Sequence, residues 1–294
     1  MKILLTGSNG QLGWELMNQS KAFGFEMKGV DLPQLDISDS VQVRDIVADY
    51  RPSLVINAAA YTSVDGAETE KDLAFIVNRD SPAHLAQLCS NEGIPLIHFS
   101  TDYVFNGNKK NPYKETDPAS PLNIYGQSKL EGEINIRSTL KEHIIFRTSW
   151  LYGIYGHNFV KTMLGLGRER KSIQVVKDQY GSPTSTNDLS EAVLTIVSKI
   201  QNRNNIEWGT YHYCGQGITS WHGFAKAIFD IAKHITSLKI KHVEPVSSDA
   251  FASKATRPDF SALDCQRIKK HFGIHTKSWR QSLEIMINRL FNEQ

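Results

Sequence analysis

Short apolar runs alternate with segments of helical periodicity along the first half of the chain. The runs are nearly continuous, which is typical of strands buried on both faces of a parallel sheet. They are Ile3–Leu5, Met27–Val30, Leu54–Ile56, Leu96–Phe99 and Ile144–Phe146, and the helical segments between them are Gln11–Phe23, Ser40–Tyr50 and Asp72–Glu92. Strand–helix–strand units of this kind form right-handed crossovers. The pattern therefore predicts an α/β fold in which helices cover both faces of a doubly wound parallel sheet.

The alternation becomes less regular after residue 151. Helical periodicity returns at Asn158–Arg170, Leu189–Ile200, Trp221–His234 and Trp279–Phe291, with short apolar stretches between these segments. We expect residues 1–151 to form the sheet domain and 172–200 to return to it. Residues 152–171 and 201–294 are expected to form a smaller C-terminal lobe.

Composition narrows the class of protein. Hydrophobic residues make up 40% and charged residues 22% of the 294 positions, and the formal net charge is +2, so no nucleic-acid partner is indicated. The three cysteines are far apart and lack metal-ligand spacing, which favours a reducing, cytoplasmic setting. No apolar run approaches the roughly 18 residues that span a bilayer, so no membrane partner is expected.

A glycine-rich turn follows the first predicted strand. Residues 7–13, Gly-Ser-Asn-Gly-Gln-Leu-Gly, have the spacing G-x-x-G-x-x-G and open a predicted helix. Glycine permits a tight turn and lets the backbone approach a pyrophosphate at the positive end of the helix. Asp31 ends the second strand, where a carboxylate hydrogen-bonds the adenine ribose of a dinucleotide. A plain strand–helix turn is the alternative, but this context favours a Rossmann-type dinucleotide-binding domain. Because Asp31 has no neighbouring arginine, NADH is favoured over NADPH.

Tyr125 and Lys129 form a Y-x-x-x-K pattern at the start of a predicted helix. Residues four apart lie on one helical face, so the ammonium is expected near the phenol. A free tyrosine has a pKa of about 10, and a nearby cation favours the phenolate, which suits the pair to acid–base catalysis. Thr101 and Asp102 end a buried strand at the sheet edge where open α/β folds bind ligands. Thr101 is therefore a candidate for a hydrogen bond to a substrate carbonyl or hydroxyl.

The glycine turn, the hydroxyl at the strand end and the Y-x-x-x-K pattern, in this order, resemble the extended short-chain dehydrogenases/reductases. Within that group the sequence is similar to the dTDP-4-dehydrorhamnose reductase family over nearly the whole chain. The segments that carry the similarity are Asn57–Thr62, Ser100–Gly107, Pro121–Gly126, Phe146–Tyr152, Asp178–Thr184 and Arg257-Pro258.

The resemblance implies reduction of the C4 keto group of dTDP-4-dehydro-L-rhamnose to dTDP-L-rhamnose by NADPH or NADH, in the synthesis of cell-surface polysaccharide precursors. It implies Tyr125 as proton donor, Thr101 as a residue that tunes this proton, and Lys129 as the residue that holds cofactor and phenol. The implied substrate contacts are Thr101, Asp102 and Trp150. The expected cofactor contacts combine the glycine turn with the positions that match the family's cofactor contacts. They are Gly7, Gly10, Gln11, Leu12, Gly13, Asp31, Asp36, Ile37, Ala60, Tyr61, Thr62, Tyr125 and Lys129.

Other activities on this fold fit the residues less well. Dehydratases usually have a glutamate directly after Thr-Asp, where this chain has Tyr103, and epimerases typically have consecutive serines in place of Thr101-Asp102. A reductase of another nucleotide keto-sugar stays open, as does a non-catalytic, dinucleotide-binding regulatory subunit. A regulatory subunit, however, has no need of the catalytic groups that this chain keeps.

Arg257 is a candidate for holding the dTDP diphosphate, because a guanidinium clasps a diphosphate with two hydrogen bonds. His98 is interpreted as an ordinary interior residue and Trp221 as a packing residue at a helix start. The sequence contains no metal motif. Only the family resemblance leaves room for Mg²⁺ and for a homodimer.

Overall fold

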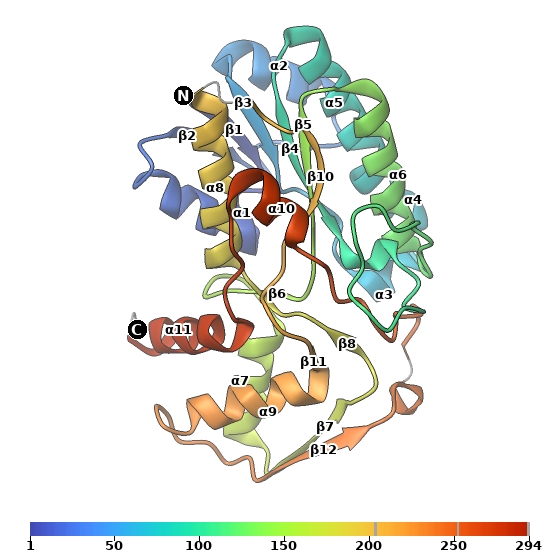
Figure 1. Ribbon diagram of the computed structural model, residues 1–294, viewed down its shortest axis with the longest axis vertical. Coiled ribbons are helices and arrows are strands. Elements are labelled where there is room, and N and C mark those ends of the chain that lie inside the picture. Colours follow the sequence, from blue (N-terminus) through green and yellow to red (C-terminus); the bar gives the residue numbers. More distant parts are fainter. Residues whose placement is uncertain (203–204, 252, 293–294) are drawn as a thin grey trace.

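A six-stranded parallel sheet forms the centre of the larger lobe in the computed structural model, which describes residues 1–202, 205–251 and 253–292 (Figure 1). In sheet order its strands are β10 (Gly209–His212), β5 (His143–Thr148), β4 (Leu96–Thr101), β3 (Leu54–Asn57), β1 (Lys2–Thr6) and β2 (Glu26–Val30). Every neighbouring pair is parallel. All five strands expected in the first half of the chain lie in this sheet, which confirms the predicted doubly wound fold.

Side chains alternate across the sheet, so each strand contributes to two hydrophobic layers. Ile3 and Leu5 of β1 belong to one layer and Leu4 to the other. The helices of the first layer are α1 (Gln11–Ser20), α8 (Thr186–Gln201) and α10 (Gln266–Phe272), and those of the second are α2 (Ser40–Tyr50), α5 (Ser81–Glu92) and α6 (Ile124–Thr139). Figure 1 shows α1 and α8 on one side of the strands and α5 and α6 on the other. Burial on both faces explains why the strands have continuous apolar sequences.

The connection from β3 to α5 is more finely divided than its periodicity indicates. The segment expected as one helix over 72–92 consists of α4 (Lys71–Phe75), the π-helical turn η1 (Ile76–Asp80) and α5, and it is preceded by α3 (Val64–Ala67). Pro82 stands in the first turn of α5. Since proline has no amide N–H, the change of helix type occurs where a continuous α-helix would lose a hydrogen bond.

A separate hydrophobic cluster forms the core of the smaller lobe. Three helices pack around it: α7 (Phe159–Glu169), α9 (Trp221–Ala232) and α11 (Trp279–Asn292). Three short strand pairs complete the lobe: β7 (Ser172–Val176) with β12 (His242–Val246), β8 (Tyr180–Gly181) with β11 (Thr219–Ser220), and β6 (Leu151–Tyr152) with β9 (Thr184–Ser185). The helices expected near residues 158, 221 and 279 are confirmed.

The boundary between the lobes differs from the expected one. β10 pairs with β5 as an edge strand of the main sheet, and α10 packs on the same sheet, although both were expected in the smaller lobe. Conversely, β7 pairs with β12 and only α8 returns to the sheet, against α1. Strand pairing decides to which lobe a short strand belongs. The sequence of such a strand does not indicate which other strand it pairs with. Of the range 201–294, residues 203–204, 252 and 293–294 lie outside the described part.

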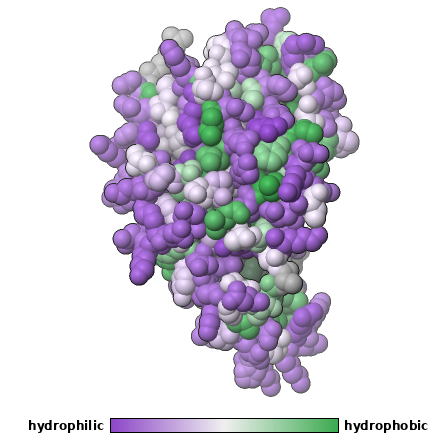
Figure 2. Space-filling model, turned by 90° about the vertical axis from the view of Figure 1, so that its right-hand side faces the viewer, coloured by the Kyte–Doolittle hydropathy of each residue, from purple (hydrophilic) through white to green (hydrophobic). Residues whose placement is uncertain are grey.

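The surface offers two general observations. In Figure 2, hydrophilic residues predominate on the face shown, and apolar residues are scattered in small groups. Among the described helices, none combines the length and the apolar character that crossing a membrane requires.

Candidate active site

A cleft with a volume of about 890 Å³ lies at the carboxyl ends of the sheet strands, and the smaller lobe forms its opposite wall with residues that include Asn158 and Trp221. All expected cofactor residues line it: Gly7, Gly10, Gln11, Leu12, Gly13, Asp31, Asp36, Ile37, Ala60, Tyr61, Thr62, Tyr125 and Lys129. Thr101, Asp102 and Trp150 line it as well. The fold therefore brings together residues from six separate segments in the place where open α/β folds bind ligands.

The glycines after β1 allow three backbone segments to come into contact. Gly7 has a φ of +75°, and a Cβ at this position would lie 2.4 Å from the nitrogen of Ala59. A Cβ on Gly13 would lie 2.1 Å from the carbonyl oxygen of Gly7. Gly10 precedes α1 and provides no side-chain cap. The first N–H groups of α1 therefore have no side-chain acceptor from Gly10. Because the residues at this helix start line the cleft, these N–H groups are available to an anion that binds there.

Asp31 is held at the end of this turn by backbone amides. Its Oδ2 accepts a hydrogen bond from the nitrogen of Asn9 at 2.9 Å, and its Oδ1 accepts one from the nitrogen of Leu32 at 2.8 Å. No arginine occurs among the described residues that line the cleft. A carboxylate in such surroundings favours a ribose 2′-hydroxyl over a 2′-phosphate.

Close helix packing places Tyr125 beside the end of β4. The Asn123 side chain caps α6 by accepting a hydrogen bond from the nitrogen of Gly126 at 2.8 Å. A Cβ on Gly126 would lie 2.2 Å from the carbonyl oxygen of Tyr103, in the 3₁₀ turn η2 (Asp102–Val104) that follows β4. Glycine at this position therefore lets the first turn of α6, which carries Tyr125, lie directly against the residues after Thr101.

Tyr125 is a neutral phenol in this environment. Burial raises the pKa of Tyr125 to about 12, a hydrogen bond with Thr101 opposes this shift, and the Asp102 carboxylate adds to it. Thr101 Oγ1 donates to Asp102 Oδ1 at 3.1 Å. Burial raises the pKa of Asp102 to about 7, and the hydrogen bond from Thr101 opposes this shift. The protonated phenol is the form that a proton donor needs.

Lys129 lies one helical turn beyond Tyr125 and is 2% exposed. Its Nζ is 3.3 Å from Nε2 of His98 on β4. Burial lowers the pKa of Lys129 to about 8, and the Glu133 carboxylate opposes this shift. The sequence predicted an ammonium beside the phenol, but the interactions that shift the pKa of Tyr125 are burial, Thr101 and Asp102. His98 is an interior residue, as interpreted from the sequence, and its hydrogen-bond partners are Lys129 and Asn57.

Two stacked indoles form the wall of the cleft that belongs to the smaller lobe. The rings of Trp150 and Trp221 are nearly parallel, at 8°, with centroids 3.5 Å apart. Trp150 has a φ of +48°, a conformation that is uncommon for a bulky residue and clusters at functional sites. Trp221 therefore lines the cleft as well as packing in the lobe, a position that no local sequence signal revealed.

Arg257 is engaged by a carboxylate in the structure and is not among the residues that line the cleft. Its Nη2 lies 2.7 Å from Oδ2 of Asp65, and it also hydrogen-bonds Ser253. The hydrogen bond from Arg257 is the main cause that lowers the pKa of Asp65 to about 2. This pair joins α3 to the loop around residue 255, whereas the sequence suggested a diphosphate as the partner of Arg257.

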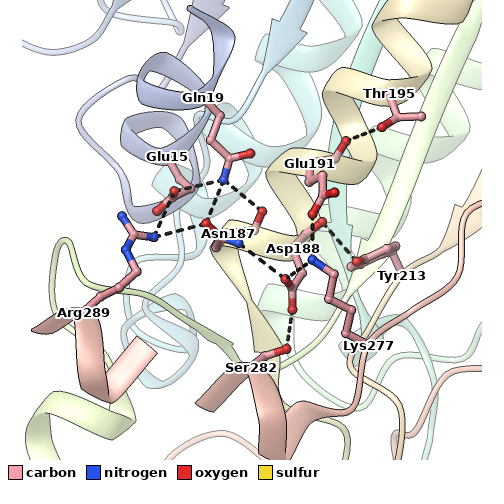
Figure 3. Close-up of polar contacts among 10 residues, drawn as sticks. All are labelled: Glu15, Gln19, Asn187, Asp188, Glu191, Thr195, Tyr213, Lys277, Ser282 and Arg289. Atoms are coloured by element: carbon pink, nitrogen blue, oxygen red, sulfur yellow. Dashed lines mark hydrogen bonds and ion pairs between the residues drawn. The ribbon is translucent and has the colours of Figure 1, made fainter. Parts of the chain in front are cut away.

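The carboxylates where α1, α8 and α11 meet are already paired with cations (Figure 3). Arg289 Nη1 is 3.7 Å from Glu15 Oε1, and Lys277 Nζ is 3.2 Å from Asp188 Oδ1 and 2.7 Å from Glu191 Oε2. In the part of the chain that the structure describes, no three His, Cys, Asp or Glu side chains are grouped as a metal ion requires. The described residues of this chain thus give no support to the Mg²⁺ that the resemblance left open, and no step of the chemistry is assigned to a metal.

The parallel sheet, the glycine turn at its edge and the Thr101–Tyr125–Lys129 wall define a nicotinamide-dependent oxidoreductase of the extended short-chain dehydrogenase/reductase class. The family model described as the RmlD substrate binding domain matches residues 1–292. The chain belongs to this family, as the resemblance in its sequence motifs predicted.

Named relatives agree with this membership. The chain is 40% identical to a dTDP-4-dehydrorhamnose reductase of Sinorhizobium fredii, covering 100% of this chain and 99% of the relative. It is 41% identical to the spore coat polysaccharide biosynthesis protein SpsK of Bacillus subtilis, covering 96% and 95%. A crystal structure of dTDP-4-dehydrorhamnose reductase from Bacillus anthracis in complex with NADP superposes with a TM-score of 0.90 at 38% identity, covering 98% of this chain and 99% of that one.

Proposed function

We propose that this chain reduces the C4 keto group of dTDP-4-dehydro-L-rhamnose to give dTDP-L-rhamnose, with NADPH or NADH as the reductant. The observation that carries the proposal is that Thr101, Tyr125 and Lys129 line the same cleft as the glycine turn that follows β1. The names of the full-length relatives supply the identity of the sugar nucleotide. A role in making polysaccharide precursors follows from the product and from the name of the Bacillus relative.

The residues present fit a dinucleotide. The turn from Gly7 to Gly13 and the first N–H groups of α1 would receive the pyrophosphate, and Asp31 the adenine ribose. Asp36, Ile37, Ala60, Tyr61 and Thr62 would line the adenine and ribose portions. When bound, the reduced nicotinamide supplies the hydride. Asp31 favours NADH, whereas the Bacillus anthracis relative was crystallised with NADP, so both cofactors belong in the test.

Tyr125 is suited to give its proton to the C4 oxygen. The ketone gains one hydride at carbon and one proton at oxygen, which yields the alcohol. The hydrogen bond with Thr101 lowers the pKa of the phenol toward the value that proton transfer needs. After the transfer the phenolate recovers its proton from solvent. Lys129 in its charged form stabilises that phenolate and holds a ribose hydroxyl of the cofactor.

The sugar nucleotide would lie between the catalytic wall and the indole wall. Asp102 is 1% exposed and has one carboxylate oxygen, Oδ2, without a hydrogen-bond partner in the structure. A buried polar atom of this kind requires a partner, and a sugar hydroxyl would supply one. Trp150 offers a flat apolar surface to the sugar or the base.

The setting of the enzyme is also part of the proposal. Cys214 and Cys265 are free thiols although their sulfur atoms lie 3.6 Å apart, which suits the reducing cytoplasm. The proposed partner is the dTDP-sugar substrate, without nucleic acid or membrane. The family resemblance adds a homodimer, which sedimentation of the purified protein would test.

The first experiment follows the loss of absorbance of the reduced nicotinamide with dTDP-4-dehydrorhamnose, using NADH and NADPH in parallel. We expect oxidation with at least one cofactor. Tyr125→Phe should lower kcat about 10²- to 10⁴-fold, because it removes the proton donor. Its cofactor affinity, measured by fluorescence titration, should stay within about twofold of the wild-type value.

The negative outcome is equally informative. A folded protein that binds either cofactor but oxidises neither with this sugar would refute the assignment to rhamnose. Other nucleotide keto-sugars would then be tried as substrates. A failure with all of them would leave the regulatory-subunit interpretation.

A further inference from the structure

A buried chain of polar side chains lies behind the catalytic wall, outside the steps described above. Lys129 Nζ is 3.3 Å from His98 Nε2, and His98 Nδ1 is 3.2 Å from Asn57 Nδ2. Asn57 Oδ1 accepts hydrogen bonds from Thr6 Oγ1 at 2.8 Å and from the nitrogen of Ala59 at 3.1 Å. The four side chains belong to α6, β4, β3 and β1, and none is more than 2% exposed. Solvent therefore cannot relax their hydrogen bonds.

The backbone fixes the orientation of the Asn57 amide. The N–H of Ala59 can only donate, so the Asn57 atom that faces it must be the carbonyl oxygen. The hydroxyl of Thr6 donates to the same oxygen. The amide nitrogen of Asn57, which can only donate, must therefore face His98.

This orientation in turn fixes the tautomer of His98. Its Nδ1 faces a donor and must act as an acceptor. Burial holds the pKa of His98 well below its usual value, and Lys129 lowers it further, so the ring is neutral and carries one proton. That proton must be on Nε2, where it is directed at the nitrogen of Lys129.

We propose that His98, held in its Nε2–H tautomer by Asn57, is a positioning residue that favours the uncharged amine of Lys129. An Nε2–H group can donate only to a nitrogen with a lone pair, so it pairs with –NH₂ and opposes –NH₃⁺. For an ammonium to donate to His98, the ring proton must move to Nδ1 and the Asn57 amide must turn over. That turn would leave the N–H of Ala59, which lines the cofactor cleft, without its acceptor.

The charged groups around Lys129 do not override this arrangement. The charged group that shifts the pKa of Lys129 is Glu133 on α6. Arg137 and the phenol of Tyr125 also lie on α6, and elements packed against α6 carry Asp102, Arg147, Arg79 and Asp80. Glu133 raises the pKa of Lys129, but its carboxylate is already paired with Arg147 at 2.8 and 2.7 Å and with Arg137 at 2.7 Å. Arg79 and Asp80 pair with each other at 2.7 Å. The balance between the charged and the uncharged form of Lys129 therefore depends on burial and on His98.

The kinetic consequence rests on the proposed reductase function. The charged form of Lys129 is the one that stabilises the Tyr125 phenolate, so activity is lost as pH rises through the pKa of Lys129. A tautomer that favours the amine lowers this pKa and moves the alkaline limb of the pH profile toward neutrality. Asn57 and His98 would then set the upper end of the working pH range.

The first test needs no turnover. Protein labelled with ¹⁵N-histidine, without cofactor or substrate, is studied by two-bond ¹H–¹⁵N correlation at pH 9, and the His98 signals are assigned by their absence in His98→Gln. We expect a protonated Nε2 and an unprotonated Nδ1. A protonated Nδ1 at this pH would overturn the inference whether or not the chain is a rhamnose-forming reductase.

The second test inverts the tautomer. Asn57→Asp keeps an oxygen toward Ala59 and Thr6 but replaces the donor that faces Nδ1 with an acceptor. The ring should then carry its proton on Nδ1 and accept from the Lys129 ammonium. Opposite charge close to Lys129 should raise the alkaline midpoint of kcat/KM by about one to three pH units.

The matched control is His143→Gln, which changes a buried histidine at the start of β5 and outside the chain of contacts. Its alkaline midpoint should equal that of the wild type. An Asn57→Asp variant with the wild-type tautomer would contradict the proposal, and so would one with the wild-type midpoint. If the variant is inactive, its ¹⁵N spectrum still decides between the two tautomers.

Discussion

The two ends of the cleft are built in different ways. The proposed cofactor end consists of backbone: Gly7 lets the turn after β1 touch the segment after β3, Gly13 lets α1 pack against that turn, and Asp31 is held by amides. The proposed sugar end consists of side chains from distant segments, among them Asp102 and the stacked pair of Trp150 and Trp221. A site shaped by backbone depends on a few small residues in one stretch of sequence. A site made of side chains depends on how the lobes pack.

The two ends are connected through the start of α1. Asn158 Nδ2 donates to Gln11 Oε1 at 3.0 Å, and the ring of Trp14 stacks on Tyr155 with centroids 5.1 Å apart. The helix that would receive the pyrophosphate therefore also contacts the lobe that carries the indole wall. Substitutions can show how independent the two ends are.

The largest effect is expected at the cofactor end. Gly13→Ala places a Cβ 2.1 Å from the carbonyl oxygen of Gly7, so the turn must move. We expect a loss of stability of about 1–3 kcal/mol, together with a clear loss of affinity for NADH and NADPH in fluorescence titration. Wild-type cofactor affinity in this variant would show that the turn does not contact the dinucleotide.

Gly165→Ala is the matched control in the smaller lobe. Gly165 lies inside α7, and a Cβ there meets no atom within 4 Å. Alanine is favoured over glycine in a helix by about 1 kcal/mol. Thermal melting should therefore move upward in this variant, with cofactor affinity unchanged.

An intermediate effect is expected at the sugar end. Trp221→Ala removes the stacking partner of Trp150, a contact worth about 0.5–1.5 kcal/mol, so KM for the sugar nucleotide should rise about 2- to 10-fold. The dissociation constant for the cofactor should not change. A variant that lost cofactor affinity to the same extent would refute the separation of the two ends.

The smallest effect is expected for the pair behind the cleft wall. Arg257→Ala and Asp65→Asn each break a partly exposed ion pair, worth at most about 1 kcal/mol, so each should lower Tm by at most a few degrees at neutral pH. Because the pKa of folded Asp65 is lowered to about 2, the stabilisation is present above the ordinary carboxyl pKa near 4 and disappears as pH falls toward 2. The Tm difference from wild type should therefore vanish in acid.

The same two variants test the role of Arg257 in substrate binding. With Arg257 held by Asp65, we expect similar and small changes in KM for both. A rise in KM confined to Arg257→Ala would instead place its guanidinium on the diphosphate of the substrate.

Much of the fold was predictable from local patterns. Five strands and most long helices follow from apolar runs and helical periodicity, because burial on both faces of a sheet leaves a continuous apolar sequence. The partners of β7 and β10 were not predictable, since a strand of four or five residues carries no information about its neighbour. The division of the segment 72–92 was missed because a π-helical turn of five residues is too short to show in the apolar periodicity of the segment.

The sequence by itself determined the family, the glycine turn after the first strand and the residues of the proposed catalytic wall. The glycine spacing and the Y-x-x-x-K pattern are local features, and a helix or a tight turn fixes their geometry wherever it occurs. The tertiary structure alone decided that Trp221 lines the cleft, that Asp65 holds Arg257, and that His98 lies between Asn57 and Lys129. These contacts join residues 31 to 192 positions apart, and only the packing of sheet, helices and lobes determines which side chains meet.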